Sequence, residues 1–182
     1  MHGVFKDMND AINASIEAQK KVCTMTLDQR EQIISLIRKK THENAEILAN
    51  MGVNETGMGN VGDKILKHHL TADKVPGTED ISTVAWSGDR GLTLVEMGPF
   101  GVIGAITPAT NPSETVICNC IGMLAGGNTV VFNPHPNAKK TTIYTINMIN
   151  EASIEAGGPD NIAVTVEAPT LDTSAIMMKH PS

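Results

Sequence analysis

The fold is decided by residues 99–136, which read PFGVIGAITPATNPSETVICNCIGMLAGGNTVVFNPHP. Two apolar runs, Phe100–Thr107 and Asn128–Asn133, lie on either side of a segment of helical character, Pro112–Ala125. Glu114 is the only charged residue in the stretch, as is typical of strands that are buried on both faces. We therefore predict two parallel strands joined by a helix, with the helix ending at a pair of glycines.

The same alternation continues toward the C-terminus. A helix is expected over Ala138–Ala156, a third strand over Ile162–Val166 and a short helix over Leu171–Lys179. Strand–helix–strand–helix–strand with short loops indicates a parallel, right-handed sheet, so the predicted fold class is α/β with three parallel strands.

Residues 1–96 have a different character, because they hold eleven of the fourteen basic and fourteen of the twenty acidic residues. Apolar periodicity predicts a solvated layer of helices here, and Thr26 with Gln29 forms a capping box that opens the second of them. The expected elements are helices over Asp7–Lys21, Thr26–Thr56 and Val61–Leu70, a polar connector over Thr71–Asp80 and a strand over Gly91–Glu96.

Composition excludes several classes of function. A net charge of −6 gives no basic field that would attract nucleic acid or anionic lipid, and no apolar run approaches the roughly 20 residues of a membrane helix. The N-terminus lacks the apolar region of a signal peptide, and three cysteines in a chain of this size indicate reduced thiols. We expect a cytoplasmic protein that binds neither nucleic acid nor membrane.

The most visible motif is Gly57–Gly62, which matches G-x-G-x-x-G. That fingerprint binds a dinucleotide only where a strand leads into the turn and a helix follows it. Here Ala45–Asn54 precedes the motif and has helical periodicity, so a turn between two helices is the favoured interpretation.

A better candidate site is the turn between the first buried strand and its helix, Thr107–Glu114. Asn111 can cap the helix and Glu114 can complete a capping box, which explains both residues without a ligand. The same place, a strand end beside a helix N-terminus, is where α/β folds bind ligands, and polar side chains there can stabilise an oxyanion or hold a nicotinamide. The residues alone leave both interpretations open.

Other candidate residues give weaker signals. Asn133–Pro136 follows the second strand and suits contact with an adenosine, although a rigid turn with a solvated His135 explains it equally. Cys118 and Cys120 lie on different faces of one helix, so we predict buried thiols rather than a metal site or a nucleophile, and His68-His69 is expected to be a solvated face. No metal site is predicted.

Seven short sequence motifs follow one another along the chain. They are ETGMG (55–59), GLTL (91–94), GPFGV (98–102), TPATNP (107–112), GNTVVF (127–132), NPHP (133–136) and EAGGPD (155–160). In this set the sequence resembles the aldehyde dehydrogenase superfamily, specifically the CoA-acylating branch of ethanolamine and propanediol utilisation. The resemblance implies an N-terminal helical layer followed by the first half of a Rossmann-like sheet.

The resemblance also implies a chemistry. A cysteine thiolate attacks the aldehyde, hydride passes to NAD, and CoA takes the acyl group. The residues expected along the NAD cleft are Thr107, Pro108, Ala109, Thr110, Asn111, Asn133, Pro134, His135 and Pro136.

Two positions depart from the pattern of hydrolytic relatives. Those relatives donate to the oxyanion from the asparagine of a P-W-N-F-P turn, and an ungapped alignment on Pro108 and Pro112 puts Thr110 there, so Thr110 and Asn111 are both candidates. They also contact the ribose through a K-P-S-E turn, where this chain has Asn133 and Pro136, so NADP is not excluded as an alternative to NAD.

The resemblance divides the chain into a helical layer (1–80), a β extension through which family members oligomerise (81–97) and a partial NAD-binding domain (98–182). The nucleophilic cysteine would follow Ser182, so we expect the N-terminal part of an oxidoreductase that is inactive alone and forms homo-oligomers. The alternatives are a non-catalytic subunit that docks onto full-length subunits and a stand-alone nucleotide-binding module. We expect location in the cytoplasm or a bacterial microcompartment lumen, and no separate encapsulation peptide.

Overall fold

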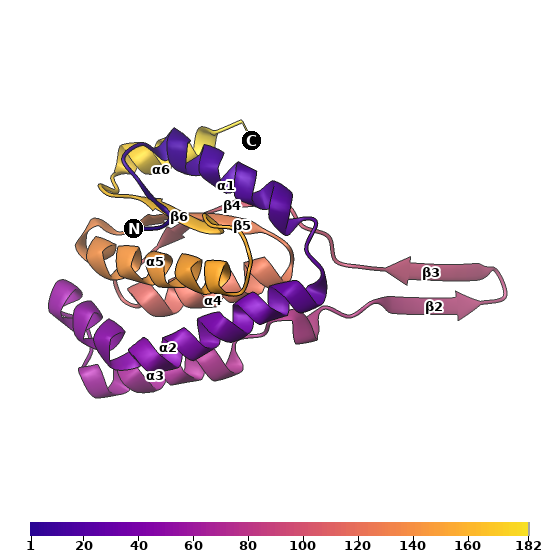
Figure 1. The fold of residues 1–182 in the computed structure, drawn as a ribbon, viewed down its shortest axis with the longest axis horizontal. Coiled ribbons are helices and arrows are strands. Elements are labelled where there is room, and N and C mark those ends of the chain that lie inside the picture. The colour runs from indigo at the N-terminus through magenta and orange to yellow at the C-terminus, as the bar shows by residue number, and fades with distance from the viewer. Residues whose placement is uncertain (182) are drawn as a thin grey trace.

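The computed structural model describes residues 1–181, so Ser182, the last residue of the expected C-terminal domain, lies outside it. A parallel sheet forms its centre, with the strands in the order β1-β6-β5-β4 (Figure 1). The strands span Val4–Phe5 (β1), Val102–Thr107 (β4), Thr129–Pro134 (β5) and Ala163–Val166 (β6). The predicted α/β class is confirmed, and the three expected strands are present.

The fourth strand, β1, corrects the prediction of a three-stranded sheet. Val4 pairs with Thr165 and Phe5 with Val166, which adds β1 to the edge of β6. Two residues are too short a run to show strand periodicity in a sequence. The pairing joins the two ends of the chain, so only the tertiary structure reveals it.

Helices cover both faces of the sheet (Figure 1). The helices α1 (Met8–Val22) and α6 (Leu171–Lys179) lie on one face, and α4 (Pro112–Ala125) and α5 (Lys139–Glu155) lie on the other. The helices α2 (Leu27–Thr56) and α3 (Val61–Lys74) form a further layer outside α4 and α5.

The N-terminal helices share their core with the sheet. Ile33, Ile34 and Ile37 of α2 are fully buried and belong to the same apolar cluster as Phe132 of β5. On the opposite face, Met8 of α1 belongs to a second cluster with strand residues of β5 and β6. The inner face of α2 is therefore largely apolar and belongs to the core of the sheet.

Helix ends follow the local signals in most places. The capping box of Thr26 and Gln29 is present, and Gly57 ends α2 with a φ of 68°, a conformation that favours glycine. The expected connector Thr71–Asp80 is partly wrong, because α3 continues to Lys74 before a short 3₁₀ turn, η1, at Thr78–Asp80. Apart from this extension, the predicted helices agree with the structure to within a few residues.

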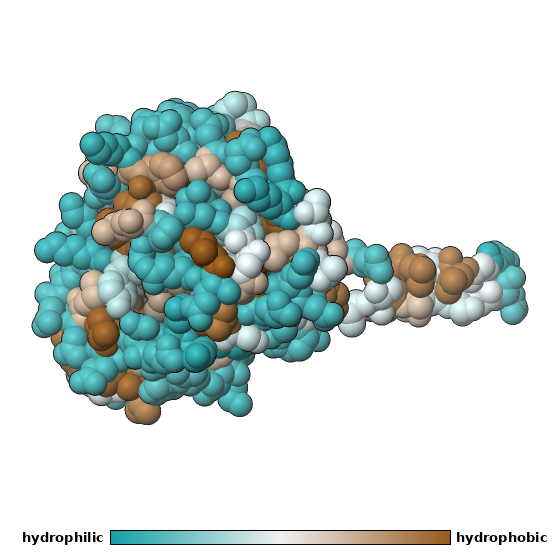
Figure 2. All heavy atoms as spheres, in the orientation of Figure 1, coloured by the Kyte–Doolittle hydropathy of each residue, from teal (hydrophilic) through white to brown (hydrophobic). Residues whose placement is uncertain are grey.

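A two-stranded hairpin extends from this body (Figure 1). The predicted strand is β3 (Gly91–Val95), and it pairs antiparallel with β2 (Val84–Gly88), which the sequence analysis missed. Every residue of both strands is exposed, and Figure 2 shows apolar side chains along the hairpin. The large ones include Trp86, Leu92 and Leu94, at 59%, 65% and 61% exposure.

Candidate functional site

The two predicted turns meet at one edge of the sheet. Because β4 and β5 are parallel neighbours, Thr107 at the end of β4 pairs with Pro134 at the end of β5. The His135 N–H donates to the Thr107 carbonyl at 3.0 Å, which joins the turns directly. The expected juxtaposition of the TPATNP and NPHP turns is therefore present, at the carboxyl edge where α/β folds bind ligands.

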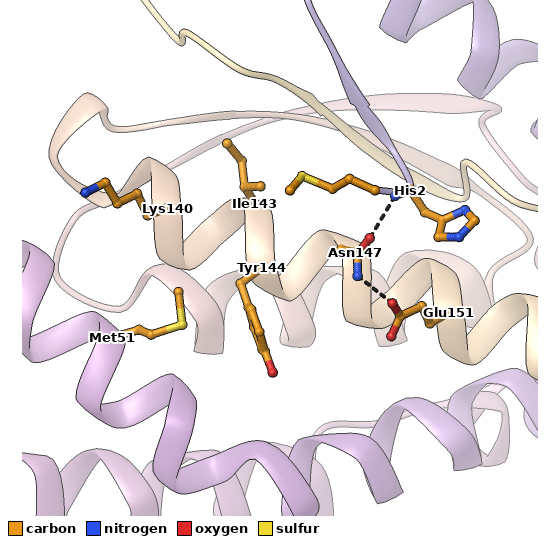
Figure 3. A pocket seen from close by; sticks show the side chains of 8 residues that line it. His2, Met51, Lys140, Ile143, Tyr144, Asn147 and Glu151 are labelled. Carbon is orange, nitrogen blue, oxygen red and sulfur yellow. Dashed lines mark hydrogen bonds between the residues drawn. The ribbon is translucent and has the colours of Figure 1, made fainter.

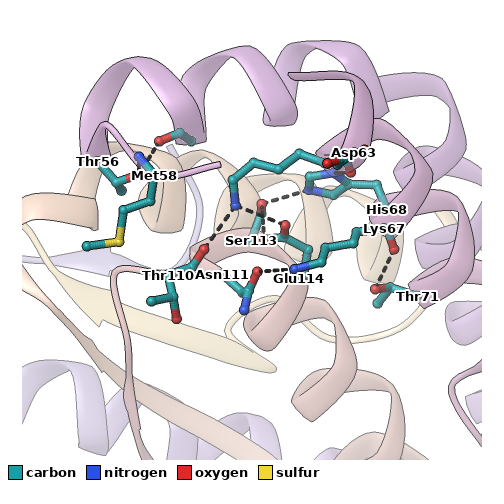
Figure 4. Close-up of polar contacts among 12 residues, drawn as sticks. Thr56, Met58, Asp63, Lys67, His68, Thr71, Thr110, Asn111, Ser113 and Glu114 are labelled. Carbon is teal, nitrogen blue, oxygen red and sulfur yellow. Dashed lines mark hydrogen bonds and ion pairs between the residues drawn. The ribbon is translucent and has the colours of Figure 1, made fainter. Parts of the chain in front are cut away.

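Asn111 lies at the N-terminus of α4, but it does not cap the helix with its side chain. Its Oδ1 instead accepts a hydrogen bond from Lys67 Nζ of α3 at 3.1 Å (Figure 4). The capping box predicted for Asn111 and Glu114 is therefore wrong. The physical reason is that lysines of α3 engage the side chains of both residues.

A buried polar network lies behind this turn. Lys64 Nζ donates to the Thr110 carbonyl at 3.0 Å and to Glu114 Oε1 at 3.3 Å, and the two charged residues are 4% and 7% exposed. Ser113 joins the network through His68 Nε2 at 2.7 Å and through Glu114 Oε2 at 3.2 Å (Figure 4). Sequence reasoning missed Lys64, although a lone carboxylate in an uncharged stretch signals a buried cationic partner.

His68 is fully buried, so the prediction of a solvated face is wrong for it. Its Nδ1 lies 2.7 Å from the Lys64 carbonyl, which can only accept, so Nδ1 carries a proton. Nε2 and Glu114 Oε2, which lie 2.7 and 3.2 Å from Ser113 Oγ, share its single hydroxyl proton. Burial lowers the pKa of His68; the Lys64 charge acts in the same direction and the Glu114 charge opposes it. The ring is therefore a neutral structural link between α3 and α4.

The expected cofactor residues differ in their exposure. Pro108, Thr110, His135 and Pro136 are exposed and Ala109 and Asn111 half-buried, whereas Thr107, Asn133 and Pro134 are buried. Asn133 is used internally, because its Nδ2 donates to the Thr170 carbonyl and to Ser174 Oγ. Asn133 therefore holds α6 against the sheet, and Pro108, Thr110, His135 and Pro136 remain open to solvent at this edge.

The Gly57–Gly62 motif joins α2 to α3 and is the predicted turn between two helices. Glu55, just before it, reaches across to the N-terminus of α5, where its carboxylate accepts from the backbone N–H groups of Lys140 and Thr141 at 2.7 and 2.8 Å. A carboxylate of the chain thus occupies the place where a phosphate would bind to this helix.

A groove of about 310 Å³ opens beside Asn111 between α3 and α4. Leu70, Thr115 and Cys118 contribute to its lining. Cys118 is exposed, which corrects the prediction of a buried thiol, whereas Cys120 is buried as expected. Burial raises the pKa of Cys120, and partial desolvation by its neighbours raises the pKa of Cys118, opposite to the shift that activates a nucleophile.

A second groove, of about 560 Å³, lies along α5 and is separate from the two turns (Figure 3). His2, Met51, Tyr144 and Asn147 are among its lining residues, and none of the lining residues belongs to the turns. Within residues 1–181 there is no group of three or more His, Cys, Asp or Glu side chains suited to a metal ion. The same part of the chain contains no helix long and apolar enough to cross a bilayer.

A parallel sheet with helices on both faces, and with polar turns gathered at the ends of two neighbouring strands, defines a doubly wound α/β protein. The chain belongs to the aldehyde dehydrogenase family, because the model of that family matches residues 2–182.

Individual relatives confirm the predicted resemblance to the acylating branch. Over 98% of its length the chain is 49% identical to the acetaldehyde dehydrogenase (acetylating) of Bilophila wadsworthia, and the match covers 37% of that protein. A propionaldehyde dehydrogenase from the Clostridium phytofermentans fucose utilisation bacterial microcompartment is 72% identical, with a TM-score of 0.97 over all of this chain and 42% of that one.

The Rhodopseudomonas palustris propionaldehyde dehydrogenase, solved with bound propionyl-CoA, is 46% identical, with a TM-score of 0.95 over 98% of this chain and 40% of that one. The chain matches the N-terminal part of CoA-acylating aldehyde dehydrogenases and spans less than half the length of the curated relatives it matches.

Proposed function

We propose that this chain forms one wall of the active site of a CoA-acylating aldehyde dehydrogenase, which converts an aldehyde, CoA and NAD to acyl-CoA and NADH. The observation that supports the proposal is the hydrogen bonding of the Asn111 side-chain amide. Its Oδ1 is held by Lys67, while no group within residues 1–181 accepts from its Nδ2. An amide donor free at the carboxyl edge of a parallel sheet suits a developing oxyanion.

This arrangement favours Asn111 over Thr110 as the oxyanion donor. A fixed Oδ1 leaves Nδ2 as the outward group of the amide, and the groove beside Asn111 gives an aldehyde a place to lie. Thr110, Pro108, His135 and Pro136 are exposed on the same edge and would line the cofactor side. NAD, when bound, accepts the hydride, and NADP is the alternative because the NPHP turn carries neither the Lys nor the Glu of hydrolytic relatives.

The 182 residues do not catalyse the reaction by themselves in this proposal. Burial raises the pKa of Cys120 and partial desolvation raises that of Cys118, and Cys23 lies in the turn after α1, outside both predicted turns. The nucleophile would come from the remainder of a longer enzyme. Purified chain supplied with propanal, CoA and NAD should therefore form no NADH, and aldehyde- and CoA-dependent NADH formation by the chain alone would contradict this part.

The exposed hairpin supports association with other subunits, either copies of this chain or full-length enzyme. Its apolar side chains are exposed along both strands, and such a surface favours burial against a partner. We therefore propose an oligomeric protein located in the cytoplasm or in a microcompartment lumen. Co-purification with a full-length relative would support a docking subunit, whereas a stable monomer that ignores that relative would contradict it.

A further inference from the structure

Two lysines of α3 reach the turn that carries the proposed oxyanion donor. Lys64 holds the backbone of the turn at the Thr110 carbonyl, and Lys67 holds the Asn111 side chain at Oδ1. The two lysines are three residues apart, so they project from one side of the helix. Each therefore restrains a different part of the same turn.

Fixing the Thr110 carbonyl also fixes the next N–H. In a trans peptide the C=O and N–H point in opposite directions, so the Asn111 N–H is directed away from Lys64. No group within residues 1–181 accepts a hydrogen bond from this N–H or from Asn111 Nδ2. The backbone N–H and the Nδ2 of Asn111 are thus fixed in position and free to donate a hydrogen bond to a ligand.

A gain in stability alone does not explain why the chain buries the Lys64–Glu114 pair. A buried ion pair such as Lys64–Glu114 loses the hydration of both charges, and an apolar pair of similar volume is often as stable. An apolar residue at position 64 would lack the directed hydrogen bond to Thr110 that the ammonium makes. Glu114, Ser113 and His68 in turn fix the Lys64 end of α3 against α4.

We propose that α3 is the positioning element of the oxyanion site, with Lys64 and Lys67 as positioning residues that hold the Thr110–Asn111 turn. The inference rests on the proposed function for the role of the turn. The restraint itself is a property of the 182-residue chain and can be measured without catalysis.

Hydrogen exchange of the chain, followed by mass spectrometry, tests the restraint. In Lys64→Met, amides of residues 115–118, which begin the hydrogen-bonded part of α4 with the bond from the Thr115 N–H to the Asn111 carbonyl, should exchange about tenfold faster, while those of β5 keep their rates. The exposed Lys67→Met variant, which carries little risk of misfolding, should accelerate the same segment to a smaller extent. Lys74→Met, an exposed lysine in the last turn of α3, is the matched control and should change neither segment.

Unchanged exchange at 115–118 in both variants would overturn the proposal, and so would equal acceleration in β5, which indicates a general loss of stability. A catalytic readout comes from a fusion in which residues 1–182 replace the corresponding part of the Clostridium phytofermentans enzyme. There, Lys67→Met should lower kcat about tenfold at unchanged KM for NAD, and Lys67→Arg should restore part of it. A fusion without any activity would count against the proposed function, while the exchange rates still decide on the restraint.

Discussion

Replacing Glu55 tests whether the motif region Glu55–Gly59 stabilises the fold rather than binding a nucleotide. The carboxylate accepts two backbone N–H groups at the start of α5 and the Thr141 hydroxyl, at 2.7 to 2.8 Å. In Glu55→Ala all three donors lose their protein acceptor. Loss of a helix cap costs about 1 kcal/mol and bonds to a charged acceptor are worth about 1.5–3 kcal/mol.

One effect opposes this loss. Glu55 lies in the last turn of α2, where a negative charge is unfavourable by about 0.5 kcal/mol, and its removal returns that amount. The expected net destabilisation of Glu55→Ala is therefore about 2 kcal/mol, which corresponds to a decrease in Tm of about 4–8 °C for a chain of this size. Glu55→Gln keeps one acceptor oxygen and should lose about half as much.

Thermal unfolding followed by circular dichroism measures both variants. Glu46→Ala, an exposed glutamate earlier in α2, is the matched control for the change in helix propensity and should shift Tm by less than about 1 °C. An unchanged Tm in Glu55→Ala would refute the capping role. A gain in NAD affinity on this substitution would show that the α5 N-terminus is a phosphate site that Glu55 blocks.

Three further predictions address other parts of the molecule. Burial lowers the pKa of His68 below its unfolded value of about 6.5, so the folded state binds fewer protons than the unfolded state, and the free energy of unfolding should fall as the pH drops below about 6.5. Urea titrations from about pH 5 to 7.5 should show this decrease, and His68→Gln should make the free energy of unfolding less dependent on pH. Replacing Leu92 and Leu94 together by Ser should shift light scattering toward smaller species without lowering Tm. Asp89→Asn at the hairpin tip should leave the size of the species unchanged. Asn133→Ala should destabilise the packing of α6 by about 2 kcal/mol, seen as faster hydrogen exchange over residues 171–179, and an unchanged rate would contradict the anchoring role.

The sequence predicts the central sheet because its signals are local. The runs that became β4, β5 and β6 are apolar and are bounded by glycine, proline and asparagine, so their limits can be read from the chain. Strand β1 has no such signal, since two residues show no periodicity and their partner lies at the other end of the chain. Strand β2 was missed because Ser87 and Gly88 weaken its pattern.

The sequence likewise predicts one part of the candidate site and not the rest. The meeting of the TPATNP and NPHP turns follows from parallel strand pairing, which the sequence predicts. The roles of Lys64, Lys67 and His68 depend on how α3 packs against α4, and no local pattern encodes that packing. The capping box at Asn111 failed for the same reason, because tertiary partners outcompete a local hydrogen bond.

The activity of the fusion between residues 1–182 and the remainder of the Clostridium phytofermentans enzyme decides whether the TPATNP turn supplies the oxyanion donor of an acylating enzyme. The fusion should form NADH only when both propanal and CoA are present. Asn111→Ala should lower its kcat about 100-fold, and Thr110→Ala should lower it less. Full activity of the Asn111→Ala fusion, or a folded fusion that binds NAD but forms no acyl-CoA, would contradict this role of the turn.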